Sequence, residues 1–367
     1  MALATAHDQR FDAERRDALV SRLFEAAIGT FDLFSVYLGE RLGLYESLAA
    51  HGPSTAAELA ERTRVHERYA REWLEQQAAT GLLDVVDVSA EPRRYGLPAA
   101  HAEVLVDHDS LNNLTGLVRQ VVGASRPLSA VVVAFRTGGG VAFASYGADL
   151  REGIADANRR MFEQLLAAEW LPAMPEVHAR LQAEPPARVA DVGCGTGWST
   201  IALARAYPLA RVFGVDLDAD SIAQAHQNAD QAHLSDRVTF DVADAAELSL
   251  TGTFDLVTAF ETLHDMARPV QALEGMRRLA GTSGVVLIAD ERVADSFVAP
   301  GGDVERLCYG FSVLHCLPAS LADPPSAGLG TVLRAPALHG LAESAGFRNV
   351  QVLPIQNDFW RFYRLDP

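Results

Sequence analysis

The chain has 367 residues, of which 49% are hydrophobic, and it carries a formal net charge of −17 at pH 7. A chain of this length can form two substantial cores, so we expect two domains rather than one. The negative charge argues against a general binder of nucleic acid or of anionic membranes, because neutralising phosphates requires a basic face.

Apolar residues do not gather into a membrane span, because no run approaches the roughly eighteen uninterrupted apolar residues that a span needs. The opening stretch MALATAHDQRFDAERRDALV carries charges throughout and lacks a continuous apolar segment, which is unlike a secretory signal. We therefore expect a cytoplasmic location.

Cysteine and lysine usage narrows the chemistry. Cys194, Cys308 and Cys316 are too few and too scattered for a disulfide framework or a zinc cluster, and we expect them to be reduced. Every basic residue is arginine, so Schiff-base and pyridoxal-phosphate chemistry is excluded.

The first hundred or so residues are mainly helical and end in two short strand candidates. Within residues 31–49 an apolar stripe at helical spacing is wider than one core contact requires. Thr55 and Glu58 have the spacing of a capping box, and a second helix over 65–81 is followed by strands over 82–88 and 93–97. Helix, turn, helix and a two-stranded wing is the order of a winged helix.

The second helix of this module is electrically neutral. A helix that reads a DNA groove is normally basic, so dimerisation explains the module and its apolar stripe better than DNA binding does. The charges that cancel are those of Arg64, Arg68, Arg71, Glu67, Glu72 and Glu75.

Residues 106–184 carry few signals beyond a glycine-rich loop over 136–150 and a helix over 158–181. From 187 onward short apolar runs alternate with helical stretches, which predicts a parallel sheet with helices on both faces. The expected strands are 188–192, 211–217, 238–244, 254–260 and 284–290; a helix over 335–347 and an antiparallel pair, 349–355 and 360–365, follow them.

The stretch VADVGCGTGWST joins the first of these strands to a helix. Its glycines, Gly193, Gly195 and Gly197, stand where a doubly wound sheet binds a ligand against a helix N-terminus. Trp198 occupies the position at which a dinucleotide fold needs a small residue, and Asp191 would repel a pyrophosphate but suits an ammonium group.

Two further acids end the next two strands. Asp216 is placed to accept both hydroxyls of a ribose, and Asp244 to accept from the exocyclic amine of adenine. With Asp191, the three strands would present carboxylates to an amino-acid head, a ribose and a base.

The region from about 185 to the end resembles a class I S-adenosylmethionine-dependent methyltransferase. The motifs are DVGCGTG, VDLD, VADA and a fourth strand ending in Phe260. With its front module the whole chain is similar to the actinobacterial winged-helix methyltransferases, and more distantly to the dimeric small-molecule O-methyltransferases. The cofactor-binding residues that the resemblance implies are Asp191, Gly193, Gly195, Gly197, Asp216, Leu217, Asp244, Ala245 and Phe260.

This resemblance implies an α/β fold: a Rossmann-like seven-stranded sheet with a reversed last strand, behind a mainly helical winged-helix domain. We place a winged-helix and dimerisation domain at 1–105, a helical linker that contributes to the active-site cover at 106–184, and the S-adenosylmethionine-binding domain at 185–367. The expected partners are a small-molecule substrate and a second copy of the chain, with neither nucleic acid nor membrane.

Methyl transfer to a hydroxyl needs a base that titrates near neutrality. In the small-molecule O-methyltransferases the base is a histidine in a His-Asp pair after strand four, which matches His264, with Asp265 or Glu261 to orient its ring. The sequence departs from that pattern at Met266 and Pro269. His264 could instead cap or pack the following helix, or orient the substrate.

The long insert after the fifth strand is expected to build the pocket for the methyl acceptor, through Tyr309, Phe311 and His315. Asp290 and Glu291 lack the further acids of a magnesium site, so no metal is expected. We interpret the chain as an O-methyltransferase for a small apolar or aromatic molecule. The alternatives are N- or C-methylation with His264 only positioning the acceptor, and a DNA-binding regulator that senses S-adenosylmethionine.

Overall fold

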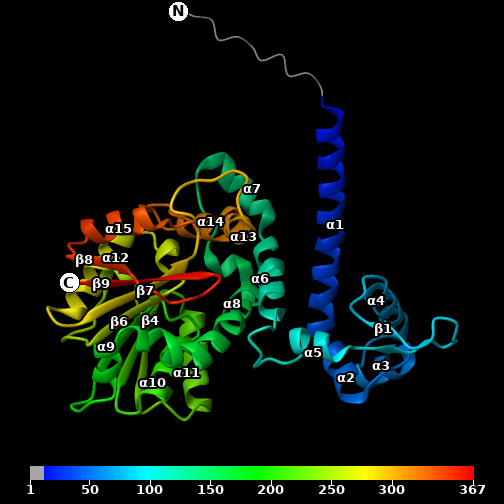
Figure 1. Cartoon of the computed structure of the whole chain (residues 1–367), viewed down its shortest axis with the longest axis horizontal. Coiled ribbons are helices and arrows are strands. Elements are labelled where there is room, and N and C mark those ends of the chain that lie inside the picture. Colours follow the sequence, from blue (N-terminus) through cyan, green and yellow to red (C-terminus); the bar gives the residue numbers. More distant parts are fainter. Residues whose placement is uncertain (1–11) are drawn as a thin grey trace, which may run out of the picture. The chain divides into compact units, whose positions relative to one another are not determined.

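The computed structural model describes residues 12–367, which fall into two compact units, one ending at Asp107 and one running from His108 to Pro367 (Figure 1). Most of the opening stretch that we judged unlike a secretory signal lies outside the described residues. None of the described helices alone is both long and apolar enough to span a membrane. The helices α6 (Thr115–Ser125) and α7 (Leu128–Thr137) reach that length and composition only together, with a 57° bend between them.

The first unit is helical with a small wing, and the predicted winged-helix order is confirmed. The apolar stripe is split between two helices, because Gly43 takes a left-handed φ of 66° and ends the run. The elements are α1 (Ala13–Arg41), α2 (Leu44–His51), α3 (Ala56–Thr63), α4 (Glu67–Ala79), β1 (Asp84–Val85), β2 (Tyr95–Gly96) and α5 (Ala99–Leu105).

The capping box of α3 is present as predicted. Thr55 Oγ1 accepts from the Glu58 backbone N–H, and the Glu58 carboxylate accepts from the Thr55 N–H. On α4, Arg68 pairs with Glu72 and Arg71 with Glu67, so these arginines neutralise glutamates of their own helix.

The second unit is built on a seven-stranded sheet in the order β5-β4-β3-β6-β7-β9-β8, which confirms the predicted fold class. The first five strands are parallel, and β9 runs antiparallel to both of its neighbours. The tail pattern predicted the antiparallel pair of β8 and β9, and the family resemblance implied the reversed last strand. The strands are β3 (Arg188–Val192), β4 (Arg211–Asp216), β5 (Val238–Val242), β6 (Leu256–Phe260), β7 (Val285–Glu291), β8 (Asn349–Val352) and β9 (Trp360–Asp366).

Helices cover both faces of this sheet (Figure 1). Neighbouring residues of β3 point to opposite faces, so Val189 joins one hydrophobic cluster and Ala190 the other. The first cluster takes apolar residues from α9 (Pro175–Leu181), α10 (Trp198–Ala206) and α11 (Ala219–Gln231), and the second from α12 (Pro269–Ala280) and α15 (Ala335–Ser344).

Two segments far apart in sequence meet beside the sheet. The Tyr146 hydroxyl donates to the Leu314 carbonyl at 2.9 Å, and the Val141 N–H donates to the Pro318 carbonyl at 2.8 Å. One segment holds η1 (Phe143–Tyr146), α8 (Gly147–Met161) and η2 (Phe162–Trp170); the other holds α13 (Asp303–Phe311), η6 (Ser312–Cys316) and α14 (Leu317–Ser320).

Candidate active site

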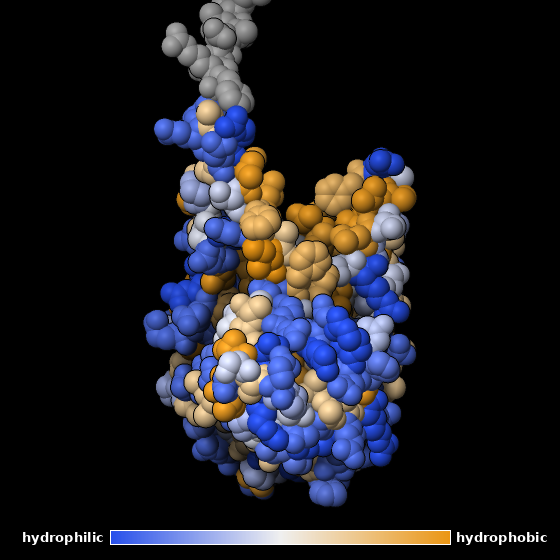
Figure 2. Space-filling view, turned by 90° about the vertical axis from the view of Figure 1, so that its right-hand side faces the viewer, coloured by the Kyte–Doolittle hydropathy of each residue, from blue (hydrophilic) through white to orange (hydrophobic). Residues whose placement is uncertain are grey.

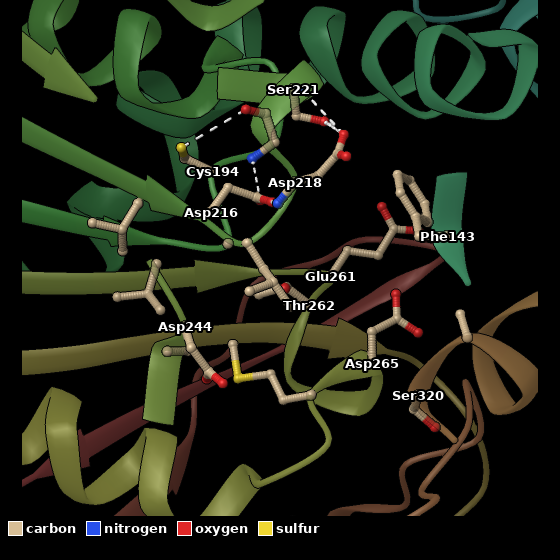
Figure 3. Close-up of a pocket in the computed structure, with 18 of the residues that line it drawn as sticks. Phe143, Cys194, Asp216, Asp218, Ser221, Asp244, Glu261, Thr262, Asp265 and Ser320 are labelled. Atoms are coloured by element: carbon tan, nitrogen blue, oxygen red, sulfur yellow. Dashed lines mark hydrogen bonds between the residues drawn. The ribbon is translucent and has the colours of Figure 1, made fainter. Parts of the chain in front are cut away.

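A cavity of about 910 Å³ opens at the carboxyl ends of the central strands. Its turn end is formed by the loops after β3, β4 and β5, which carry Gly193, Asp216 and Asp244. We call the opposite part of the cavity the acidic end. Figure 3 shows Asp216 and Asp244, which belong to the turn end, on one side of the cavity, and Glu261, Asp265 and Phe143, which belong to the acidic end, on the other. The acidic end is lined by Phe143, Asn158, Glu261, Asp265, His315 and Ser320.

The glycine turn needs glycine for two different reasons. Gly193 and Gly197 have φ of 73° and 84°, and a Cβ there would lie 2.2 Å from Thr262 Oγ1 and 2.8 Å from Phe240 Cζ respectively. Gly195 has a φ of 52° with no atom within 4 Å of its Cβ position, so open space lies above it. Gly193 and Gly195 line the cavity, whereas Gly197 caps α10 behind it.

Asp191 corrects one prediction, because its carboxylate does not line the cavity. It is only 1% exposed and accepts from the hydroxyls of Ser199, Thr200 and Thr258 at 2.6–2.7 Å. Burial raises the pKa of Asp191, and the three hydroxyls oppose that shift. The acid therefore ties the start of α10 and β6 to β3, instead of meeting the ammonium group of a ligand.

Asp216 and Asp244 do line the cavity, as do Leu217, Ala245 and Phe260. Asp216 accepts from the N–H groups of Gly195 and Asp218 at 2.8 and 2.9 Å, and burial raises its pKa against these bonds. The hydrogen bond from Gly195 connects the carboxyl end of β4 to the glycine turn. Asp244 accepts from the Ala246 N–H at 2.7 Å.

His264 lies in η5 (Leu263–Asp265), just after β6, and is 2% exposed. Its Nδ1 lies 2.9 Å from Asp290 Oδ1, and its Nε2 lies 3.5 Å from Asp265 Oδ1. Burial alone would lower the pKa of His264, but the carboxylates of Asp290 and Asp265 outweigh it and hold the pKa well above its ordinary value. The imidazole ring itself does not line the cavity. Its neighbour Asp265 does, and therefore lies between the ring and the cavity.

The predicted acceptor residues are only partly brought together. His315 lines the cavity and is 3% exposed. Tyr309 does not line it: this side chain faces solvent, and Arg334 donates to its hydroxyl at 3.2 Å. Phe311 does not line it either. These two placements correct the prediction for Tyr309 and Phe311.

Cys316 joins the histidine cluster, although its sequence position showed no sign of this. His264, Asp265 and Cys316 each have one potential metal-ligating atom within 4.8 Å of those of the other two. The sequence predicts no metal site. Burial raises the pKa of the Cys316 thiol to about 12.

Comparison with known proteins agrees with this geometry. Residues 184–320 match the model of a methyltransferase domain, and residues 33–107 match an Rv2258c-like winged HTH domain. Residues 184–320 form an S-adenosylmethionine-dependent methyltransferase domain.

Among curated relatives, 27-O-demethylrifamycin SV methyltransferase of Amycolatopsis mediterranei is 31% identical over 121 residues, which are 33% of this chain and 44% of that protein. Methyltransferase GfsG of Streptomyces halstedii is 33% identical over 138 residues, 37% of this chain and 45% of that protein. The chain thus matches less than half the length of either relative.

The structure of human N-acetylserotonin methyltransferase in complex with S-adenosylmethionine resembles the whole chain, with a TM-score of 0.69 and 18% identity over 98% of this chain and 99% of that one. At this identity the likeness shows a common fold.

The methyltransferase domain fits this cofactor by the shape and charge of its turn end. The open space above Gly195 leaves room for a ligand against the backbone, and Asp216 presents an acid to it. Four residues that sequence reasoning missed also line the cavity. Three of them, Phe143, Arg151 and Asn158, come from a region that carries no sequence motif. The fourth, Arg268, could have been suspected only because it lies close in sequence to His264 and Asp265.

Proposed function

We propose that the chain transfers a methyl group from S-adenosylmethionine to a hydroxyl of a small apolar or aromatic molecule, with His264 as the general base. The observation that carries the proposal is one continuous cavity, which runs from Gly193 and Asp216 at the turn end to Asp265 beside His264. A donor and an acceptor held together in one cavity are what an in-line displacement needs.

At the turn end the chain's task is to bind and orient the cofactor, which supplies a methyl group already activated by a sulfonium. Gly193 and Gly195 bring backbone close to its methionine part, and Asp216 accepts from its ribose hydroxyls. Asp244 lies beside Arg268, which donates to it at 2.7 Å, and keeps its other lone pairs for the adenine amine. Leu217, Ala245 and Phe260 supply apolar contacts.

At the acidic end the chain's task is to place the acceptor and remove its proton. Asp290 accepts from Nδ1 of His264, which fixes the ring and leaves Nε2 for the proton. Phe143, Ile154 and Phe162 line the neighbouring wall and suit an aromatic acceptor. N- or C-methylation remains the alternative, in which His264 would only position the acceptor.

The pH dependence of turnover tests the base. Because Asp290 and Asp265 hold the pKa of His264 well above its ordinary value, kcat/KM should rise as the pH increases through that pKa. The midpoint should lie above about 6.5, the ordinary value for histidine. Transfer from radiolabelled S-adenosylmethionine to a phenolic acceptor found by screening, followed from pH 6 to 9, measures it.

The cofactor's positive charge gives this profile a second feature. A bound sulfonium would add positive charge to the cavity and disfavour a protonated imidazole, so the midpoint of kcat should lie below that of kcat/KM. A profile without a rise, or with a midpoint at or below the ordinary value for histidine, would rule out His264 as the base.

We further propose that the chain forms a homodimer through α1. This helix buries few of its side chains in the first unit, and Phe24 and Phe31 are 68% and 69% exposed. Figure 2 shows apolar side chains along one face of the helix that follows the grey residues. An exposed apolar stripe of this length marks a protein interface. Its residues are Leu19, Val20, Leu23, Phe24, Ile28, Phe31, Phe34 and Leu38.

Sedimentation velocity tests the dimer. Phe24→Asp with Phe31→Asp should shift the protein from dimer to monomer, whereas Arg22→Glu, which lies on the opposite side of α1, should leave it dimeric. A wild-type protein that sediments as a monomer at micromolar concentration would refute the proposal.

The proposal assigns no nucleic-acid partner, because the arginines of α4 pair with glutamates of the same helix. It places the enzyme in the cytoplasm, whose reducing conditions suit three buried free thiols.

A further inference from the structure

The charges at the acidic end are unbalanced. Glu261 and Asp265 line this part of the cavity. Both arginines that line the cavity are already paired: Arg151 with Asp218 at 2.8 Å and Asp220 at 3.1 Å, and Arg268 with Asp244 at 2.7 Å and Glu247 at 2.9 Å. Burial lowers the pKa of His315, so its ring is neutral at physiological pH. A carboxylate that entered here would find acids without a free cation among the described lining residues.

Glu261 is held in a strained conformation that places its side chain in the cavity. Its φ is 53°, in the left-handed region that residues other than glycine rarely adopt. The backbone is held there by the Glu261 N–H, which donates to the Ala289 carbonyl at 2.7 Å, and Asn158 donates to Oε2 at 2.5 Å. Strain of this kind is maintained at sites where a side chain must point in one direction.

Glu291 is a buried carboxyl group whose charge interacts with that of Glu261. Burial and the neighbouring Glu261 raise the pKa of Glu291 well above its ordinary value. Burial also raises the pKa of Glu261, and the hydrogen bond from Asn158 opposes this shift. Of the two carboxyl groups only Glu261 lines the cavity, so Glu261 is the one that a ligand would meet.

One polar atom at the same end has no hydrogen-bond partner. It is Nε2 of His315, whose side chain is 97% buried and lines the cavity. Buried polar atoms are normally satisfied, so this nitrogen points to a ligand that places a polar atom at the acidic end.

We infer that the methyl acceptor carries a protonated amine, which Glu261 binds in a charge-assisted hydrogen bond, and that compounds with a carboxylate at this position are rejected. The inference rests on the proposed function, because it assigns the acidic end to the acceptor. In this arrangement Asp265 accepts a second hydrogen bond from the amine or the hydroxyl, and His315 Nε2 bonds a polar atom of the acceptor. Glu261 then determines specificity, whereas His264 acts on the proton.

Three matched phenols test the inference: tyramine, 4-propylphenol and 3-(4-hydroxyphenyl)propanoate, which share a skeleton and differ in charge. Binding to the full-length protein saturated with S-adenosylhomocysteine is measured by calorimetry. Tyramine should bind about tenfold or more tightly than the propanoate, since hydrogen bonds to charged groups are the strong ones, and 4-propylphenol should lie between them.

Two variants that remove one charge each make the test specific. Glu261→Gln should abolish the preference for tyramine. Asp323→Asn, at an exposed acid that lines the same cavity, should keep it. Equal affinity for the three phenols, including a failure of all three to bind, would overturn the inference, and so would a preference that survives Glu261→Gln. Because no methyl is transferred here, a failure of the proposed reaction would show separately, in the transfer assay.

Discussion

Replacing Asp216 with alanine is expected to weaken the binding of S-adenosylhomocysteine by about a hundredfold, because each hydrogen bond to a charged group contributes about 1.5–3 kcal/mol. The carboxylate has two tasks in the proposal. It accepts from the ribose hydroxyls, and it accepts from the Gly195 N–H at 2.8 Å, which fixes the turn around the methionine part. Calorimetric titration of wild type and variant measures the change.

Asp241→Ala provides the matched control. Asp241 lies on the neighbouring strand β5, is exposed and does not line the cavity. Asp241→Ala therefore removes one negative charge, as Asp216→Ala does, but leaves the proposed ribose site intact. Its affinity should equal that of wild type. Thermal unfolding of both variants separates lost binding from lost structure. Wild-type affinity in Asp216→Ala would contradict the ribose assignment.

Replacing His264 with alanine is expected to lower kcat by about 10²–10⁴-fold, the usual contribution of a positioned acid or base. The affinity for S-adenosylhomocysteine should stay unchanged, because the imidazole does not line the cavity. Steady-state kinetics with the screened phenol and calorimetry with S-adenosylhomocysteine measure the two effects independently.

The alanine variant also leaves Asp290 buried without its partner at 2.9 Å, and breaking a buried pair in this way costs about 3–5 kcal/mol of stability. His264→Gln keeps a hydrogen-bonding side chain and separates the loss of the base from the loss of the fold. His226→Ala, at an exposed histidine of α11, should retain full activity. If the variants raise KM and leave kcat intact, His264 positions the acceptor and is not the base.

Much of the turn end could be predicted because it depends on local order in the sequence. Parallel strands that alternate with helices bring their carboxyl ends to one edge of a sheet. Residues at those ends, such as Gly193, Asp216 and Asp244, therefore meet in space, and all three line the cavity. The same rule misled us for Asp191, which precedes the strand end and turns inward to three hydroxyls.

The acidic end could not be predicted in this way, because it is assembled by packing between distant segments. Phe143 and Asn158 reach the cavity from a region without a motif, and His315 reaches it from the insert after β7. Periodicity shows that a segment is helical and does not show which neighbour its faces meet, so Tyr309 and Phe311 were assigned to a pocket that they do not line.

The amino-acid sequence by itself determined the parallel sheet, the antiparallel pair of strands that follows it, the capping box of the winged helix and the glycine turn, since each follows from spacing and propensity over a few residues. Only the tertiary structure decided that Glu261 is strained into the cavity and backed by Glu291, and that His264 lies between Asp290 and Asp265. These arrangements depend on burial and on charges that come from two strands and their loops, and no local pattern encodes them.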